Sequence, residues 1–200
     1  TNTASHSDPT VLLQFAREPQ EGRVKTRMLP RLSASQACHL HSELTLWTCR
    51  QLLDSGLGPV EMSVAGDTRH TLFDQCLALG VTRVSQQCGR DLGQRMYNAF
   101  QRGLEHYAAV VLVGSDCPDI DPHYLKRAVA ALQTAPIVVG PANDGGYVLL
   151  GARVVTEDIF NGISWGTDQV FVQTQRALAR EGLQWAELPR LTDIYRPEDL

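Results

Sequence analysis

Residues 109–122 read Ala-Val-Val-Leu-Val-Gly-Ser-Asp-Cys-Pro-Asp-Ile-Asp-Pro. Residues 109–113 are all apolar, which predicts a short buried strand. This strand ends abruptly at residues 114–116 (Gly-Ser-Asp), and residues 121–122 then pair a capping aspartate with proline at the first helical position. A strand, a polar tip and a capped helix in this order indicate an α/β fold.

The rest of the chain repeats this alternation of short apolar runs and longer amphipathic stretches. The expected strands cover residues 11–16, 60–65, 81–85, 109–113, 137–140, 147–150 and 185–188. The expected helices cover residues 33–54, 67–79 (capped by Asp67), 91–107, 121–133 and 167–181. We therefore expect an α/β single domain of three layers with a mixed, mostly parallel sheet, in which the close pair 137–140 and 147–150 is antiparallel.

The composition fits one folded domain. The chain has 200 residues, of which 43% are hydrophobic and 20% charged, so a disordered chain is excluded. A net charge of −4 argues against wholesale nucleic-acid binding, and the longest apolar run, residues 108–113, is far too short for a membrane span. We expect residues 1–8 to be a frayed terminus or a remnant of cloning, and residues 9–200 to form the domain. Five cysteines, an odd number without a C-x-x-C pair, favour the reducing cytoplasm.

A basic island follows the first expected strand. Residues 17–31 contain Arg17, Arg23, Lys25, Arg27 and Arg31 against only two acidic residues. The stretch lacks both the Walker A and the G-x-G-x-x-G patterns. It nevertheless combines a glycine, a lysine and arginines, which together suit phosphate recognition. The alternative is a solvated loop with incidental charge.

Two aspartates follow strands at what should be the same edge of the sheet. Asp116 lies at the carboxyl tip of the strand 109–113, and Asp193 follows the last expected strand. A carboxylate beside a phosphate loop is suited to hold Mg²⁺ or Mn²⁺. The alternatives are that Asp116 caps the next turn and that Asp193 caps the final helical turn.

The segment 143–147 (Asn-Asp-Gly-Gly-Tyr) has the composition of a tight turn, and a hairpin alone would explain it. Its glycines would also let a ligand approach closely, which makes Asp144 a candidate for binding substrate hydroxyls or the metal. Trp165 precedes the last helix. Its ring suits either stacking on a sugar or base, or anchoring of the helix cap.

Six stretches together resemble a known family. They are FAREPQEGRVKTRMLPRL (15–32), RDLGQRMYNAF (90–100), VVLVGSDCPDID (110–121), VVGPANDGGYVLLG (138–151), SWGTDQV (164–170) and LTDIYRPEDL (191–200). In this order they resemble the bacterial glycosyltransferase-like proteins of the nucleotide-diphospho-sugar transferase superfamily. The group is known as radical-SAM/selenodomain-associated transferase 1 and is linked to arsenosugar biosynthesis. The chain departs from the family's usual pattern at Arg17, where lysine is usual, and at Tyr195, where a second acid is frequent.

The resemblance implies a GT-A-like fold that binds a nucleotide through the first loop and Mg²⁺ or Mn²⁺ through a strand-end acid. The candidate nucleotide- or phosphate-binding residues are Ala16, Arg17, Gly22, Arg23, Lys25, Thr26, Arg27 and Ser115. The candidate catalytic residues are Asp116, Asp144 and Lys25. The candidate substrate-binding residues are Asn143, Asp144, Gly145, Gly146 and Trp165. The candidate metal ligands are Asp116 and Asp193.

Three functions remain open at this point. The first is a glycosyltransferase-like enzyme that moves a sugar from a nucleotide-diphospho-sugar to a small-molecule acceptor. The second is a nucleotidyltransferase that uses an NTP on a phosphorylated acceptor, although the guanylyltransferases of the superfamily usually begin with an LAGG-like loop where this chain has FARE. The third is a non-catalytic nucleotide-binding module, because fold and binding residues would look the same.

Overall fold

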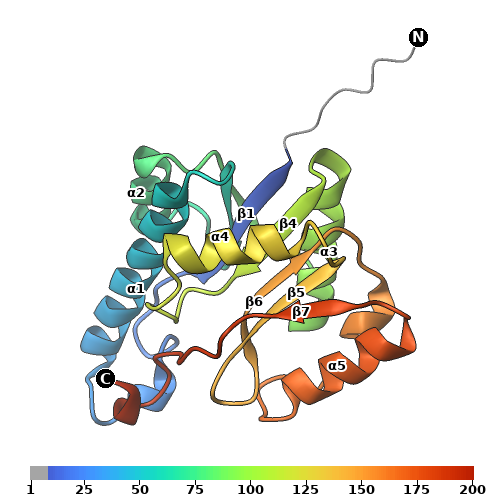
Figure 1. The fold of residues 1–200 in the computed structure, drawn as a ribbon. Helices are drawn as coiled ribbons and strands as arrows, with labels where there is room; N and C mark the ends of the chain where they lie inside the picture. Colours follow the sequence, from blue (N-terminus) through green and yellow to red (C-terminus); the bar gives the residue numbers. More distant parts are fainter. Residues whose placement is uncertain (1–8) are drawn as a thin grey trace.

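The computed structural model describes residues 9–200 and arranges them around a seven-stranded sheet of order β3-β2-β1-β4-β6-β5-β7 (Figure 1). The strands are β1 (Thr10–Arg17), β2 (Val60–Ala65), β3 (Arg83–Gln86), β4 (Ala109–Val113), β5 (Ile137–Pro141), β6 (Tyr147–Ala152) and β7 (Trp185–Glu187). Strand β6 pairs antiparallel with β4 and β5, whereas the other pairs are parallel. The expected α/β class and mixed sheet are therefore confirmed.

Helices cover both faces of this sheet. They are α1 (Ala34–Ser55), α2 (Thr71–Leu79), α3 (Leu92–His106), α4 (Pro122–Ala131) and α5 (Val170–Arg180), with short 3₁₀ turns η1 (Thr26–Met28), η2 (Glu157–Phe160) and η3 (Pro197–Asp199). Apolar residues of α1, α2 and α4 form one core with the sheet, and those of α3 and α5 form the other. In Figure 1, α4 lies in front of the sheet and α3 behind it. None of the helices described within residues 9–200 is long and apolar enough to cross a membrane.

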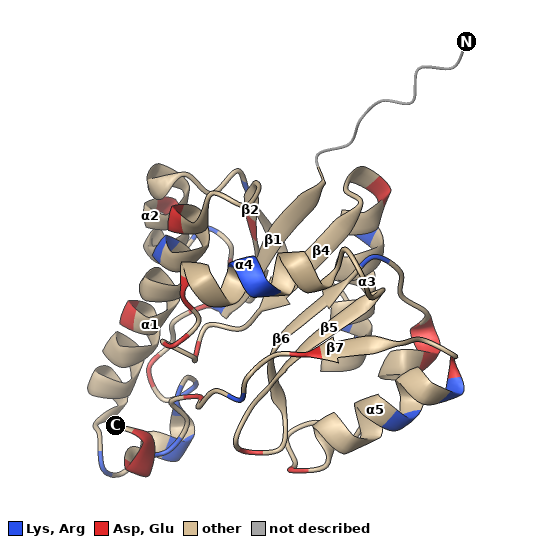
Figure 2. Cartoon of the chain, in the orientation of Figure 1, with Lys and Arg blue, Asp and Glu red and all other residues tan. Residues whose placement is uncertain are grey.

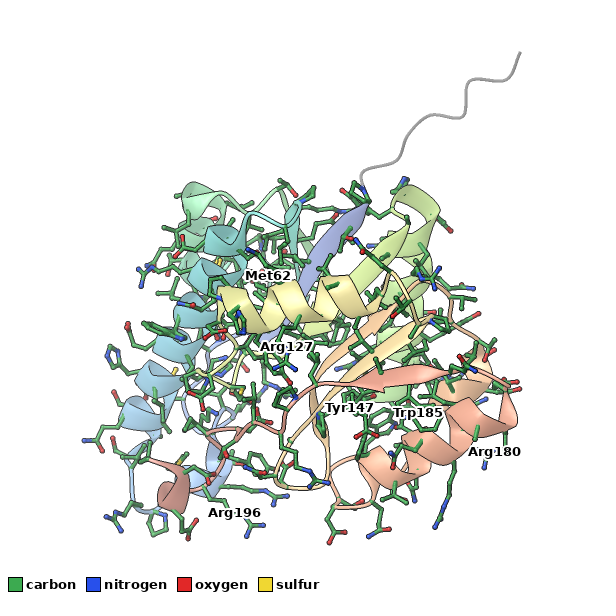
Figure 3. The ribbon with its side chains drawn as sticks, viewed as in Figure 1. Met62, Arg127, Tyr147, Arg180, Trp185 and Arg196 are labelled. Carbon is green, nitrogen blue, oxygen red and sulfur yellow. The ribbon has the colours of Figure 1, made fainter. Side chains whose placement is uncertain are left out.

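The two cores use opposite sides of the same strands. Met62 of β2 is fully buried in the core beneath α1, α2 and α4, whereas Tyr147 and Trp185 pack against the core beneath α5 (Figure 3). Because side chains of a strand alternate between faces, burial on both faces requires nearly continuous apolar strands. The five buried residues of β4 meet this requirement.

Two helix starts follow the expected capping chemistry. The side chain of Ser33 accepts a hydrogen bond from the backbone N–H of Gln36 at 3.1 Å, and the Gln36 side chain accepts from the Ser33 N–H at 2.9 Å. This reciprocal pair is a capping box. Asp121 accepts from the Tyr124 N–H at 2.8 Å, with Pro122 at the first helical position.

Three expected boundaries are wrong. Asp67 does not cap α2, because its carboxylate binds the backbone N–H and guanidinium of Arg69, and the ring nitrogen Nδ1 of His70 caps the helix instead. The third strand, β3, covers residues 83–86 rather than the expected 81–85. Helix α5 begins at Val170 rather than 167, because residues 164–167 close a separate turn through the Thr167 hydroxyl.

The topology decides where a ligand would bind. Strands β1 and β4 are neighbours, but the chain leaves β1 toward β2 on one side and reaches β4 on the other. Such a switch point opens a crevice at the carboxyl ends of the strands, where ligands of open α/β sheets bind. The loop after β1 and the tip of β4 both lie there.

Candidate functional site

A cleft of about 1280 Å³ lies along this carboxyl edge. It is lined by the loop after β1, the tip of β4, the β5–β6 turn, the segment before α5 and the segment that follows β7. Figure 2 shows basic and acidic segments side by side where the first loop meets the C-terminal end of the chain. The cleft therefore carries both signs of charge, which suits a phosphate ligand accompanied by a cation.

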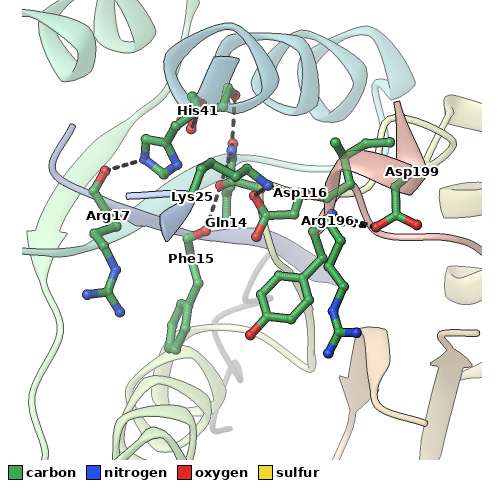
Figure 4. A network of polar contacts seen from close by, with 12 residues as sticks. Gln14, Phe15, Arg17, Lys25, His41, Asp116, Arg196 and Asp199 are labelled. Atoms are coloured by element: carbon green, nitrogen blue, oxygen red, sulfur yellow. Dashed lines mark hydrogen bonds and ion pairs between the residues drawn. The ribbon is translucent and has the colours of Figure 1, made fainter. Parts of the chain in front are cut away.

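Lys25 forms the floor of the first loop. Its backbone takes a left-handed conformation (φ 52°). The side chain is only 3% exposed, and its Nζ lies 2.6 Å from Oδ1 of Asp116, whose side chain is 42% exposed (Figure 4). The same ammonium donates to the carbonyl oxygen of Ile194. The predicted phosphate loop and the predicted strand-end acid are thus in direct contact.

A buried hydrogen-bond network fixes the tip of β4. Gln14, in the middle of β1, is fully buried and donates from Nε2 to the Ser115 hydroxyl at 2.9 Å and to the Thr45 carbonyl at 3.0 Å. The Ser115 hydroxyl donates to the carbonyl of Phe15 at 2.7 Å. These bonds tie β1, α1 and the β4 tip together one residue before Asp116.

His41 of α1 holds the end of β1. Its Nε2 lies 2.8 Å from the carbonyl oxygen of Arg17 (Figure 4). Burial lowers the pKa of His41 below its ordinary value of 6.5, although the hydrogen bond to Arg17 opposes the shift. The imidazole is therefore neutral at pH 7, with its proton on Nε2 as the donor to this carbonyl.

The segment after β7 closes the cleft from the side. The backbone N–H of Ile194 donates to the carbonyl of Asp116 at 2.8 Å, and the guanidinium of Arg27 lies 4.6 Å from the ring centre of Tyr195. Asp193 precedes Ile194 and lies in an acidic corner of the cleft together with Asp116 and Asp144. Burial, and then repulsion from Asp116 and Asp144, raises its pKa to about 7.

The opposite side of the cleft is the β5–β6 turn. Asp144 accepts from the N–H of Gly146 at 3.0 Å, so it forms the tight turn that was the alternative to substrate binding. Asn143 donates to the Thr192 hydroxyl at 2.6 Å. A Cβ on Gly145 (φ 90°) would collide with the backbone of Asp168, so this position requires glycine for packing.

Trp165 stands beside this turn. Its ring meets that of Tyr147 edge-on, with centroids 6.5 Å apart, and a Cβ on Gly93 would lie within 3.2 Å of the indole. The Tyr147 hydroxyl donates to the sulfur of Met96 at 3.7 Å, and burial raises the pKa of Tyr147 above its ordinary value. The indole is half-buried and lines the cleft.

The structure brings most of the sequence-predicted residues to this cleft. Those that line it are Ala16, Arg17, Arg23, Lys25, Thr26, Arg27, Ser115, Asp116, Asn143, Asp144, Gly146, Trp165 and Asp193. Gly22 and Gly145 do not line it, and both take positive φ angles in the adjoining turns. The roles of all these residues stay predictions.

Sequence reasoning missed several residues of the cleft region. Gln14 gave a usable signal, because a polar side chain in the middle of an apolar strand needs a partner. His41 lies within an expected helix, and no motif of the sequence marks it. Arg90, just before α3, and Arg95, in its first turn, also line the cleft; the stretch 90–100 contains both, but the sequence assigned neither a role.

The acids of the cleft fit a divalent metal only in company with a phosphate. Among residues 9–200 no group of three or more His, Cys, Asp or Glu side chains is arranged to hold a metal ion. Asp116 and Asp193 are, however, close enough to repel each other, and both line the cleft. Mg²⁺ in proteins takes one or two carboxylates and completes its shell with waters and substrate phosphates. The donor set therefore fits Mg²⁺ or Mn²⁺ bound together with a phosphate ligand.

Comparison in sequence places the chain in one family. Residues 48–167 match the family described as an uncharacterised protein conserved in bacteria, DUF2064. A search of the curated proteins finds no match.

Solved structures give closer comparisons. The crystal structure of a proposed nucleotide-diphospho-sugar transferase from Desulfovibrio desulfuricans G20 is 30% identical over 94% of this chain and 82% of its own, with a TM-score of 0.84. A CMP:2-keto-3-deoxy-manno-octonic acid synthetase complexed with CTP matches at 10% identity over 95% and 94%, with a TM-score of 0.58. The manganese complex of Rv0371c from Mycobacterium tuberculosis matches at 18% identity over 96% and 95%, with a TM-score of 0.51. The last two share the fold.

Proposed function

The chain belongs to the DUF2064 family, and from this premise we propose that it is a glycosyltransferase-like enzyme. It binds a nucleotide-diphospho-sugar in the cleft and passes the sugar to a small-molecule acceptor. The 30% identical proposed nucleotide-diphospho-sugar transferase supports the more general statement that this chain is a nucleotide-binding transferase. Membership of the narrower group of radical-SAM/selenodomain-associated transferases stays a prediction, which identification of the acceptor will test.

One observation carries the proposal: the buried Lys25 in contact with Asp116 beneath a basic loop. A lysine that is 3% exposed and held at the switch point of the sheet is placed for an anion in the crevice, not for solvent. Arg23 and Arg27 of the same loop also line the cleft. Together these groups bind the diphosphate and stabilise the negative charge that develops on it as the sugar leaves.

Asp116 and Asp193 are the residues that would hold the divalent metal. When bound, Mg²⁺ or Mn²⁺ would neutralise part of the charge on the diphosphate. The Gln14–Ser115 network keeps the Asp116 backbone in position for this task, and His41 fixes the end of β1 beside it.

The β5–β6 turn and Trp165 are suited to orient the sugar. Asn143 and Asp144 lie exposed at the cleft, where an amide and a carboxylate can bind sugar hydroxyls. The half-buried indole of Trp165 offers an apolar surface for the sugar ring. The Nε2 of His41 is engaged with the Arg17 carbonyl, which assigns this imidazole a positioning role at the end of β1.

Nucleotidyl transfer is the second candidate. It is favoured by the likeness in fold to a synthetase complexed with CTP, which extends over 95% of this chain. In that reaction an NTP loses pyrophosphate, whereas sugar transfer releases a nucleoside diphosphate. The released product therefore separates the two reactions.

The test begins with thermal shifts of the full chain. Nucleotide-diphospho-sugars, nucleoside diphosphates and NTPs are compared, each with and without Mn²⁺. A ligand at ~100 times its Kd adds about 2.7 kcal/mol of stability. We expect a metal-dependent stabilisation by one diphospho-sugar, followed by release of its nucleoside diphosphate on ³¹P NMR with a suitable acceptor. Stabilisation by an NTP alone with release of pyrophosphate would establish the second candidate, and tight binding without any turnover would indicate a binding module.

The chain offers a matched control for these measurements. It has two lysines, Lys25 and Lys126. Lys126 is exposed on α4 and does not line the cleft. Lys126→Met should therefore bind like the wild type, while Lys25→Met should lose nucleotide stabilisation. Equal loss in both variants would contradict a specific role for Lys25.

A further inference from the structure

Lys25 occupies the position in which a cation is needed. Its Nζ contacts Oδ1 of Asp116 at 2.6 Å, and it also binds the Ile194 carbonyl. The negative charges of Asp116 and Asp144 both act on Asp193, and the positive charge of Lys25 opposes them. A single ammonium thus offsets part of the repulsion that Asp193 experiences from the other two carboxylates.

The two contacts of Lys25 conflict with the proposed metal site. An oxygen that is 2.6 Å from an ammonium cannot coordinate a divalent ion along the same direction. A metal ion that arrives alone must either displace the buried lysine from Oδ1 or bind the second oxygen of Asp116 beside the ammonium, where the two positive charges repel each other. Hydrogen bonds to charged groups are about twice as strong as neutral ones, so the ammonium opposes metal binding substantially.

A nucleotide phosphate changes this balance. It supplies an anion to which the displaced ammonium can turn, and the flexible four-carbon stem of lysine allows a short movement at little energetic cost. The same phosphate brings further oxygen ligands to the metal. The carboxylate of Asp116 is then released for the metal.

We propose that Lys25 acts as an internal cation that keeps Asp116 closed to a divalent metal until a nucleotide phosphate draws the lysine away. Metal binding then depends on bound nucleotide, and the free protein has little affinity for the metal alone. This inference rests on the proposed function, because it takes a nucleotide phosphate as the ligand of Lys25.

The first test uses the wild-type chain and its two lysines. Lysine labelled with ¹³C gives two sets of side-chain signals by NMR, and the Lys126→Met variant identifies those of Lys25. We expect Mg²⁺ alone to leave the Lys25 signals in place and a nucleoside diphosphate to shift them. If Mg²⁺ alone shifts the Lys25 signals as far as the nucleotide does, the inference is overturned.

The second test measures Mn²⁺ binding without nucleotide, from the EPR signal of the free ion. Removing the internal cation in Lys25→Met should tighten Mn²⁺ binding about tenfold, the effect of losing one competing charged hydrogen bond. Lys126→Met should bind Mn²⁺ as weakly as the wild type. Unchanged or weaker binding in a folded Lys25→Met protein would overturn the inference. Because this test contains no nucleotide, its result is independent of whether the wild type binds a diphospho-sugar, on which the proposed function depends.

Discussion

The two walls of the cleft differ in how firmly their polar groups are held. The first wall, residues 14–27 with 115–116, contains a buried lysine and a buried glutamine, each with two hydrogen-bond or ion-pair partners. The second wall, residues 143–147 with 164–168, is mostly exposed. Its hydrogen bonds are largely local, such as that from Gly146 to Asp144.

This difference separates two tasks. The diphosphate is the same in every nucleotide-diphospho-sugar, so one set of charges on a rigid strand tip suits it. A sugar and its acceptor vary, and exposed turn residues on a scaffold are where such variation is accommodated. We therefore expect changes in the first wall to weaken binding of all nucleotides, and changes in the second wall to alter the preference among sugars.

Loss of the strand-tip carboxylate should have the largest effect. Asp116→Asn removes the charge that faces Lys25 and would hold the metal, so metal-dependent binding of a nucleoside diphosphate should weaken about 100-fold, or ~2.7 kcal/mol. Isothermal titration calorimetry with Mn²⁺ measures this. Asp119→Asn, an exposed neighbour outside the cleft, is the control. Metal-dependent affinity that survives in Asp116→Asn would assign the phosphate site elsewhere.

The acidic corner should also make stability depend on pH. The pKa of Asp193 rises from 3.8 to about 7 in the folded protein. Between these values the folded state keeps a proton that the unfolded state has lost, so this group's contribution to stability falls as the pH rises from about 4 to about 7. Relative to Asp193→Asn, the metal-free wild type should lose melting temperature over that range and stay level above it. A difference between the two proteins that is constant with pH would contradict this environment for Asp193.

A smaller effect is expected from the buried support of the first wall. In Gln14→Met the Ser115 hydroxyl keeps its bond to Phe15, and a buried amide oxygen that has no partner among the described residues is removed. The loss of the two bonds that Gln14 donates, to Ser115 and to the Thr45 carbonyl, opposes this gain, so stability should change little. Nucleotide affinity should fall about fivefold because the strand tip is held less firmly. Thr48→Val, which removes another buried hydroxyl without contact to Ser115, should leave both quantities unchanged. If Gln14→Met binds the nucleotide as tightly as the wild type does, Gln14 has no positioning role.

The smallest effect should come from the second wall. Trp165→Leu should weaken binding of a nucleotide-diphospho-sugar by ~1 kcal/mol and leave the nucleoside diphosphate unaffected. The matched control is Trp47→Leu, because Trp47 is exposed on α1, outside the cleft. Equal weakening of both ligands by Trp165→Leu would remove the distinction between the two walls.

The sequence predicted the fold and the meeting of the two main site residues for a simple reason. Apolar runs and capped helices are local patterns, and Lys25 and Asp116 both follow strands that end at the same edge. The support of the site was less predictable. The bond from Lys25 to Ile194 joins residues 169 positions apart, and it depends on how the last segment returns to the cleft.

Local competition accounts for the wrong helix start. Asp67 has the residue type of a cap, but its carboxylate finds a closer partner in Arg69, which leaves the cap to His70. Similarly, Asp144 has the residue type of a catalytic acid and also closes its own turn. Residue type indicates what a side chain can do, and its neighbours decide what it does.

The central claim is that the first wall binds the diphosphate of a nucleotide between Lys25 and Asp116. A crystal structure of the full chain with a nucleoside diphosphate and Mg²⁺ tests it most directly. We predict that the diphosphate lies within hydrogen-bond distance of the Lys25 ammonium, with Mg²⁺ between it and Asp116. A nucleotide bound elsewhere, with the Lys25–Asp116 contact intact, would contradict the account.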